Sequence, residues 1–133
     1  MSQTKPSQFV DYPDILKKIS PWTKFRAVVE DVYDGDTLKV IISIGFDVYI
    51  YKSIRLKDVY APELDTPLGP DARNHLLTLC PIGSPIILDT DNLSQTFTRY
   101  IGTIHTISGV NVNSSMNEWI RTFGGPAGAG TWW

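Results

Sequence analysis

Three consecutive runs rich in valine, isoleucine, tyrosine and phenylalanine constrain the fold of this chain more than any other feature. They cover residues 22–33, 37–44 and 46–60, and apolar and polar residues partly alternate along them. Asp34-Gly35 and Gly45 separate the runs, and aspartate and glycine both tolerate the positive φ that tight turns demand. Long strands joined by such short turns predict a three-stranded meander that curls into a small barrel.

The spacing of apolar residues changes after the third run. One face of a helix that ends before Pro81 is predicted by Leu68, Ala72, Leu76, Leu79 and Cys80. Residues 84–91 and 97–107 are again strand-like, and Ser114-Ser115 is predicted to cap a short helix over residues 116–123. Five strands, with one helix after strand 3 and a short helix after strand 5, predict a mainly β, OB-type barrel. The strand face of such a barrel often receives oligonucleotides.

The two ends of the chain differ in character from its middle. Residues 1–21 are punctuated by prolines and predict an irregular N-terminal arm, whereas residues 22–123 carry all the predicted strands and helices. Residues 124–133 are glycine-rich, end in Trp132-Trp133 and are not expected to form regular structure. We therefore expect one barrel domain between an arm and a tail.

Composition limits the classes of protein to which the chain can belong. Its 133 residues argue for one domain, and 42% apolar with 20% charged residues is typical of a soluble globular protein. No apolar run approaches the ~18 residues that cross a bilayer, no signal-peptide pattern is seen, and Cys80 has no second cysteine to pair with. We expect an intracellular or virion-associated protein without membrane contact. The net charge of −2 means that any binding of nucleic acid must rest on local charge.

Two carboxylates and two arginines fall at or near the ends of the predicted strands. Asp36 opens the second strand, and Arg55 lies near the end of the third. Glu63 follows in the next loop, and Arg99 enters the fifth strand. Carboxylates suit a hard cation or the activation of a water, and arginines bind phosphate bidentately. Together the four residues suit phosphodiester chemistry, whereas each alone also fits a turn, a solvated strand face or a polar loop.

The order of several short motifs is more specific than any one of them. DGDT at residues 34–37 is followed by IRLKDVYAPE at 54–63, GPDA at 69–72 and FTRYIG at 97–102. Across roughly residues 24–123 the chain resembles the staphylococcal nuclease (thermonuclease-like) family. The resemblance implies an OB barrel with helices, and calcium-dependent hydrolysis of DNA and RNA that leaves 3′-phosphate ends. Single-stranded or flexible nucleic acid is the expected substrate.

The resemblance implies a role for each matching position. Asp36 is similar to the first carboxylate ligand of the metal, and Ala61 stands where the family offers a backbone carbonyl to calcium. Arg55 and Arg99 resemble the two arginines that contact phosphate. Glu63 resembles the acid to which activation of the attacking water is assigned.

Tyr60 departs from the family pattern, because it stands where the family typically has a second carboxylate ligand. The loss of a carboxylate weakens a calcium site, since affinity rises with ligand charge. Tyr60 would instead stack on a base or cap the end of the barrel. Asp34 would support the metal ligands from behind, and Thr37 adjoins them as a residue that also suits a strand.

A second hypothesis is a non-catalytic member of the same family that serves as a binding or structural module in a larger assembly, such as a phage particle. The acidic balance of the chain and its glycine-rich tail, in place of a further helix, motivate this alternative. Trp132 and Trp133 would then dock on a partner or a neighbouring subunit, or else fold back over the barrel. A third hypothesis is binding of oligonucleotides through the barrel face without hydrolysis.

Overall fold

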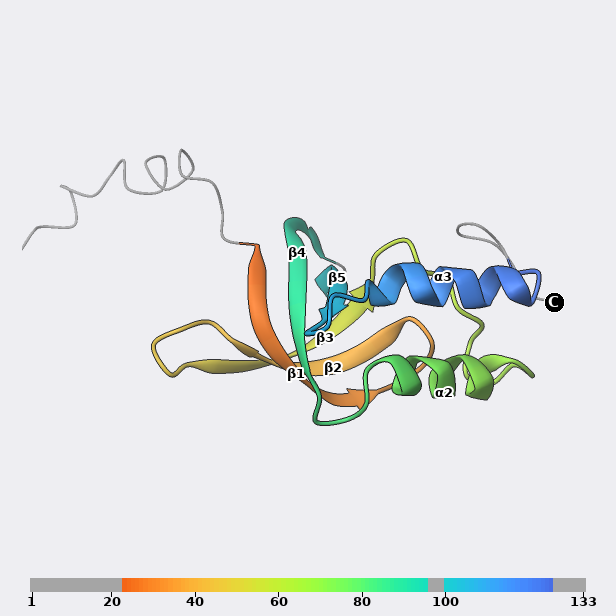
Figure 1. Cartoon of the computed structure of the whole chain (residues 1–133), viewed down its shortest axis with the longest axis horizontal. Helices are drawn as coiled ribbons and strands as arrows, with labels where there is room; N and C mark the ends of the chain where they lie inside the picture. Colours follow the sequence, from red (N-terminus) through yellow and green to blue (C-terminus); the bar gives the residue numbers. More distant parts are fainter. Residues whose placement is uncertain (1–22, 96–99, 126–133) are drawn as a thin grey trace, which may run out of the picture.

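A computed structural model describes residues 23–95 and 100–125 of the chain. Within them five strands form a closed barrel, and two helices lie together at one of its ends (Figure 1). The elements in chain order are β1 (Lys24–Val32), β2 (Thr37–Ser43), β3 (Tyr49–Leu56), α2 (Gly69–Leu79), β4 (Pro85–Gln95), β5 (Tyr100–Thr106) and α3 (Val112–Thr122). The predicted mainly β barrel, with one helix after strand 3 and another after strand 5, is confirmed.

The strand order β1-β2-β3-β5-β4 closes the barrel on itself. β1 pairs antiparallel with both β2 and β4, in registers that place Ala27 opposite Ile42 and Ile86. β3 and β5 run parallel, with Arg55 opposite Ile101. Closure removes the free strand edges that an open sheet would present to other chains.

The barrel interior is built from alternate residues of each strand. Leu38, Val40 and Ile42 of β2 are buried, as are Ile54 and Leu56 of β3. Successive side chains of a strand point to opposite faces, so the residues between these positions face outward. This alternation decides which side chains of β2 and β3 reach solvent.

Helix α3 packs on the barrel through an apolar stripe of Val112, Met116 and Ile120. Its N-cap is Asn111, whose side-chain oxygen accepts a hydrogen bond from the N–H of Ser114 at 3.0 Å. The prediction that Ser114-Ser115 caps a helix over residues 116–123 was wrong. The helix begins earlier because Asn111 supplies the capping oxygen and Val112 belongs to the buried stripe.

Asn113 joins α3 to the seam between β3 and β5. Its side-chain oxygen accepts a hydrogen bond from the N–H of Ile104 at 3.0 Å. Its amide nitrogen donates to the carbonyls of Lys57 and Gly102, both at 3.1 Å. Both the oxygen and the nitrogen of this buried amide therefore have hydrogen-bond partners. These bonds, together with the apolar contacts, fix the position of α3 on the barrel.

Helix α2 buries Ala72 and Leu76, with Cys80 directly after its end. The Cys80 thiol donates to the carbonyl of Leu76 at 3.3 Å, and burial raises its pKa to about 12. The sequence placed Cys80 on the apolar face of this helix, and the residue is buried. Among the described residues, neither helix combines the length and apolar character that a membrane span requires.

Strand β3 is shorter than predicted. It begins at Tyr49 and ends at Leu56, whereas the sequence pattern extended the strand over residues 46–60. Lys57 and Asp58 form a turn instead, and Asp58 adopts a left-handed backbone with φ 58°. Arg55 consequently lies one residue from the end of the strand, close to the loop that follows.

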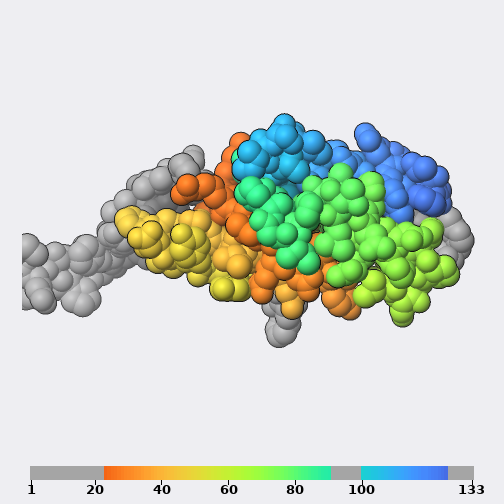
Figure 2. Space-filling view, turned by 60° about the horizontal axis from the view of Figure 1, so that its bottom comes forward, coloured from red at the N-terminus to blue at the C-terminus, as the bar shows by residue number. Residues whose placement is uncertain are grey.

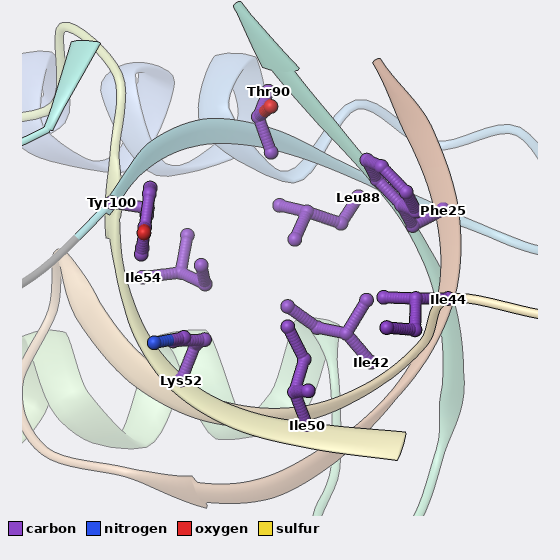
Figure 3. Close-up of a pocket in the computed structure, with 9 residues that line it drawn as sticks. All are labelled: Phe25, Ile42, Ile44, Ile50, Lys52, Ile54, Leu88, Thr90 and Tyr100. Atoms are coloured by element: carbon purple, nitrogen blue, oxygen red, sulfur yellow. The ribbon is translucent and has the colours of Figure 1, made fainter. Parts of the chain in front are cut away.

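The end of the barrel away from the helices is open. A cavity of about 220 Å³ lies there, lined by apolar side chains such as Phe25, Ile50 and Leu88 (Figure 3). Lys52 also lines it, with its Nζ 5.3 Å from the centre of the Tyr100 ring.

The β2–β3 hairpin and the helices lie at opposite ends of the long axis of the molecule (Figures 1 and 2). Phe46 at the tip of this hairpin is 100% exposed and has a left-handed backbone with φ 55°. Such a conformation is rare for a bulky residue, so the tip is a locally unfavourable turn without packing to offset it.

Candidate functional site

The turn between β1 and β2 brings the two aspartates of the DGDT motif against α2. Gly35 does not have the positive φ that the sequence pattern suggested. A Cβ at this position would lie 2.6 Å from the Cβ of Ala61 and 2.7 Å from the Cβ of Ala72. Gly35 is therefore needed for close approach, because the turn is pressed onto the helix and onto the loop after β3.

Asp36 is held from several sides. Its Oδ1 accepts a hydrogen bond from the Thr37 hydroxyl, and its Oδ2 accepts one from the N–H of Ala61, both at 3.0 Å. Its backbone carbonyl accepts from the N–H of Leu56 at 2.8 Å. The side chain is only 10% exposed. These bonds fix the carboxylate at the junction of β2, β3 and the following loop.

Arg55 pairs with this carboxylate. Its Nη2 lies 3.7 Å from Asp36 Oδ2 and donates to the carbonyl of Val59 at 3.1 Å. The ring of Tyr60 lies against the guanidinium, with 4.9 Å between the guanidinium carbon and the ring centre. Strand pairing places Arg55 here, since Thr37 and Arg55 are opposite each other across β2 and β3. A guanidinium has five N–H donors, more than these contacts use, so it retains capacity for a phosphate oxygen.

Asp34 is buried behind Asp36. Its Oδ1 accepts a hydrogen bond from the backbone N–H of Asp36 at 3.0 Å. Burial, the negative charge of Asp36 and, to a smaller extent, the charge of Glu63 raise the pKa of Asp34 to about 7. The turn thus concentrates negative charge, and any cation that enters it would favour the ionised form of Asp34.

Glu63 lies on the loop between β3 and α2, with its side chain exposed. Its backbone carbonyl accepts hydrogen bonds from the N–H of Thr66 at 3.0 Å and from the Thr66 hydroxyl at 2.6 Å. Gly69 approaches the same carbonyl so closely that a Cβ there would collide with it. The backbone at Glu63 is therefore fixed while its carboxylate stays in solvent, near enough for its charge to act on Asp34.

The donors at this site fit a hard cation, although only with a small ligand charge. Asp36 offers two carboxylate oxygens, each with a lone pair beyond the bond it accepts from Thr37 or Ala61. Burial first, and the charge of Asp36 second, raise the pKa of the neighbouring Asp34 to about 7. Within residues 23–95 and 100–125, however, no three His, Cys, Asp or Glu side chains are grouped to hold an ion. Water or a phosphate oxygen would have to complete the coordination.

Six of the residues singled out in the sequence lie together at the end of the barrel that carries the helices. They are Asp34, Asp36, Thr37, Arg55, Tyr60 and Ala61. Glu63 lies on the adjoining loop. Arg99, Trp132 and Trp133 lie outside the described residues, so their predicted roles stay predictions.

Sequence reasoning missed Arg73, which ties α2 to the strand before the turn. Its Nε donates to the carbonyl of Val32 at 2.9 Å, and its Nη2 lies 3.8 Å from Asp31 Oδ1. Arg73 directly follows the GPDA motif at residues 69–72, but the sequence contains no sign that its partner would be a strand carbonyl. Through Val32 and Asp31, Arg73 positions the strand that leads into the turn.

Comparison with known proteins does not identify the chain, because no family model matches it and no curated protein matches it.

Proposed function

We propose that this chain is a phosphodiesterase that hydrolyses DNA or RNA with the help of a divalent cation, calcium in the first instance. The observation that carries the proposal is the pairing of Asp36, at the end of the β1–β2 turn, with Arg55 of β3 at 3.7 Å, while the exposed Glu63 lies on the adjoining loop and its charge acts on Asp34. A cation ligand, a phosphate ligand and a solvent-accessible base within one small region are what hydrolysis of a phosphodiester requires. The motif resemblance to the staphylococcal nuclease family supports the same reading.

Each side chain has a distinct part in the proposed reaction. A bound cation would polarise the phosphate and offset the charge that grows on it. Asp36, with the backbone carbonyl of Ala61, would hold that cation. Arg55 would bind a non-bridging phosphate oxygen, and Arg99 would be the second arginine. Glu63, exposed and on a fixed backbone, would take the proton of the attacking water.

Calcium is expected to bind weakly, because Tyr60 supplies a ring where a second carboxylate would add charge. The contact between Tyr60 and Arg55 at 4.9 Å gives the ring another task, which is to hold the guanidinium plane in place. A Tyr60→Asp variant would therefore raise calcium affinity while loosening Arg55.

The test is cleavage of single-stranded DNA in calcium and in chelator, with Glu63→Gln and Arg55→Ala variants. Calcium-dependent cleavage that falls at least about 100-fold in both variants would support the proposal. Glu118→Gln, a matched change at an exposed glutamate of α3, should leave cleavage unchanged. Melting curves of all variants separate loss of function from loss of folding, since Arg55 also contacts Asp36 and Val59. Wild-type protein that cleaves no substrate with any divalent cation would end the proposal.

A non-catalytic binding module is the second candidate function. It is favoured by the internal contacts of Arg55, whose guanidinium already has a carboxylate, a carbonyl and a ring as partners. In that case the protein would bind nucleic acid or a protein partner without cleavage. The proposed docking of Trp132 and Trp133 on a partner or second copy belongs to this candidate. Truncation after Gly130 would test it: lost assembly with an unchanged melting temperature supports docking, and a collapsed melting temperature contradicts it. An intracellular or virion setting stays a prediction from sequence.

A further inference from the structure

The outward faces of β2 and β3 form one continuous strip that ends at Arg55. Ile50, Lys52 and Ile54 point into the barrel (Figure 3), so the residues between them on β3 face outward. The hairpin strip, as we define it, consists of Tyr49, Tyr51, Ser53 and Arg55 on β3 with their register partners Ser43, Ile41, Lys39 and Thr37 on β2. One end of the strip is the proposed site, and the other end is the hairpin tip.

Two tyrosines of the strip are largely exposed. Tyr49 is 60% exposed and Tyr51 is 65% exposed, and both belong to a regular strand rather than to a loop. A ring held on a strand has a fixed position and therefore loses little freedom when a flat ligand stacks on it. Exposed aromatic rings of this kind are the usual stacking platforms for unpaired bases.

The strip carries an exposed cation, Lys39, in a chain that is acidic overall. It contains Lys39 and Arg55 and no carboxylate. Lys52 points into the barrel and Arg55 is paired with Asp36, so Lys39, which is exposed, is the cation that the strip offers to a phosphate. This positive charge lies on the same surface as the exposed rings.

The spacing of the two rings favours a single strand over a duplex. Tyr49 and Tyr51 stand two residues apart on one strand, which separates their side chains by about 6.8 Å. Bases stacked in a double helix are only about 3.4 Å apart. Two neighbouring bases can use both rings only when the nucleic acid strand is unstacked and extended, and only an unpaired strand exposes its base faces.

We propose that the hairpin strip binds an extended single strand of DNA or RNA, with bases on Tyr49 and Tyr51 and a phosphate at Lys39, and leads it to Arg55. The proposal rests on the proposed function only for the delivery of a phosphate to the Asp36–Arg55 pair. Binding along the strip itself requires neither a cation nor cleavage. What the strip adds to the expected single-stranded substrate is a binding surface outside the site, Tyr49, Tyr51 and Lys39, which a strand of several nucleotides would reach and a dinucleotide at Arg55 would not.

Binding of a fluorescein-labelled oligothymidylate, about twelve nucleotides long and measured by anisotropy in chelator, tests the proposal without cleavage. Tyr49→Ala and Tyr51→Ala should each weaken binding roughly 10-fold, whereas Tyr51→Phe, which keeps the ring, should bind like wild type. Lys39→Ala should lower the slope of log affinity against log salt by about 0.7. Ile82→Ala, at an exposed apolar residue between α2 and β4, is the matched control and should change nothing.

Cleavage assays then separate the strip from the site. Tyr51→Ala should slow cleavage of the twelve-nucleotide substrate and leave cleavage of a dinucleotide unchanged. If a Tyr49→Ala/Tyr51→Ala double variant binds the oligonucleotide as tightly as wild type, or if a duplex binds as well as the single strand, the proposal that the strip binds a single strand is overturned, whether or not the enzyme cleaves. If the double variant loses binding while wild-type protein cleaves no substrate with any divalent cation, the proposal that the strip binds a single strand is supported and the proposed function is contradicted.

Discussion

The two ends of the barrel are built on opposite principles. At the end that carries the helices, Asp34 and Asp36 are buried and linked by hydrogen bonds to Thr37, Ala61 and each other. At the open end, the cavity is mainly apolar, and the hairpin beyond it exposes Phe46 to solvent. The strip of outward residues on β2 and β3 connects these two environments.

This difference shows that the buried polar groups, which are unfavourable for folding unless they have partners, lie at the end that carries the helices. Burial of a carboxylate is unfavourable unless its partners are well placed, so a buried cluster of this kind persists only with support from the surrounding fold. Exposed rings and an open apolar cavity cost little in folding but leave surface for another molecule. We read the helical end as the place for chemistry and the open half as a place for contact.

The largest expected effect is at Asp36. Asp36→Ala would leave Arg55 and the N–H of Ala61 without their buried partner, and we expect a loss of about 3–4 kcal/mol in the free energy of unfolding. Lys52→Ala at the open cavity should cost less than about 1 kcal/mol, because the contact that the ammonium group makes with the Tyr100 ring, 5.3 Å away, is a weak one. Urea denaturation of both variants measures the two losses in the free energy of unfolding. Equal losses would contradict the proposed difference between the two ends of the barrel.

Two glycines test the same difference, because Gly35 lies in close contact with other residues whereas Gly45 lies in an exposed turn. Gly35→Ala would place a Cβ 2.6 Å from that of Ala61, and we expect a cost of about 2–3 kcal/mol from overpacking. Gly45→Ala in the hairpin has no atom within 4 Å to meet, and its φ of 88° limits the cost to about 1–2 kcal/mol of backbone strain. Thermal unfolding measures both changes. A larger loss at Gly45 would show that the turn at Gly35 can move away from α2.

The raised pKa of Asp34 makes the helical end sensitive to pH. In the folded protein the pKa is about 7, against an ordinary value of 3.8, so between these values the native carboxyl keeps a proton that the unfolded chain has lost. Stability should therefore fall as the pH rises from about 4 to about 7, and this contribution should be constant above about 7. Asp34→Asn keeps an oxygen for the N–H of Asp36 and should remove the slope, with a gain on the order of 1 kcal/mol at pH 8.

Asp71→Asn, at an exposed aspartate of α2, is the control for the pH series and should keep the slope of the wild type. Calcium bound at Asp36 should bind more tightly as the pH rises through about 7, because Asp34 then becomes ionised. A calcium affinity that does not change with pH would place the cation elsewhere.

The smallest effect is expected at the hairpin tip. Phe46 is fully exposed and has φ 55°, so Phe46→Gly removes unfavourable backbone geometry without removing any packing. We expect the melting temperature to stay the same or to rise by an amount that corresponds to less than about 1 kcal/mol. A clear decrease would mean that the ring has a partner in solution, such as a second copy of the chain.

The order of strands and helices could be predicted because the alternation along β2 and β3 and the helical spacing of Ala72 and Leu76 are local signals. The reason why residue 35 must be a glycine could not be predicted from the sequence. The Cβ atoms that exclude a side chain there belong to residues distant in sequence. The pairing of Asp36 with Arg55 depends on the register of two strands, which no local pattern specifies.

The role of Tyr60 was left open between stacking on a base and capping the barrel, and the structure shows its ring against Arg55. The start of α3 was misplaced for a simpler reason. Serine and asparagine are about equally good caps, and the choice between Asn111 and Ser114 depends on which register buries Val112 and Met116.

The three hydrogen bonds of Asn113 have a consequence for how the molecule opens. Because this one amide group joins α3 to β5 and to the carbonyl of Lys57, detachment of the helix would leave the N–H of Ile104 and two carbonyls without these partners. The amide protons of these segments should then exchange with deuterium as a single cooperative unit, with one shared rate. Lys57 begins the loop that carries Glu63, so the same opening event would release the proposed base. Transient unfolding of the helix would then interrupt hydrolysis, while the nucleic acid would remain bound to the β2–β3 hairpin.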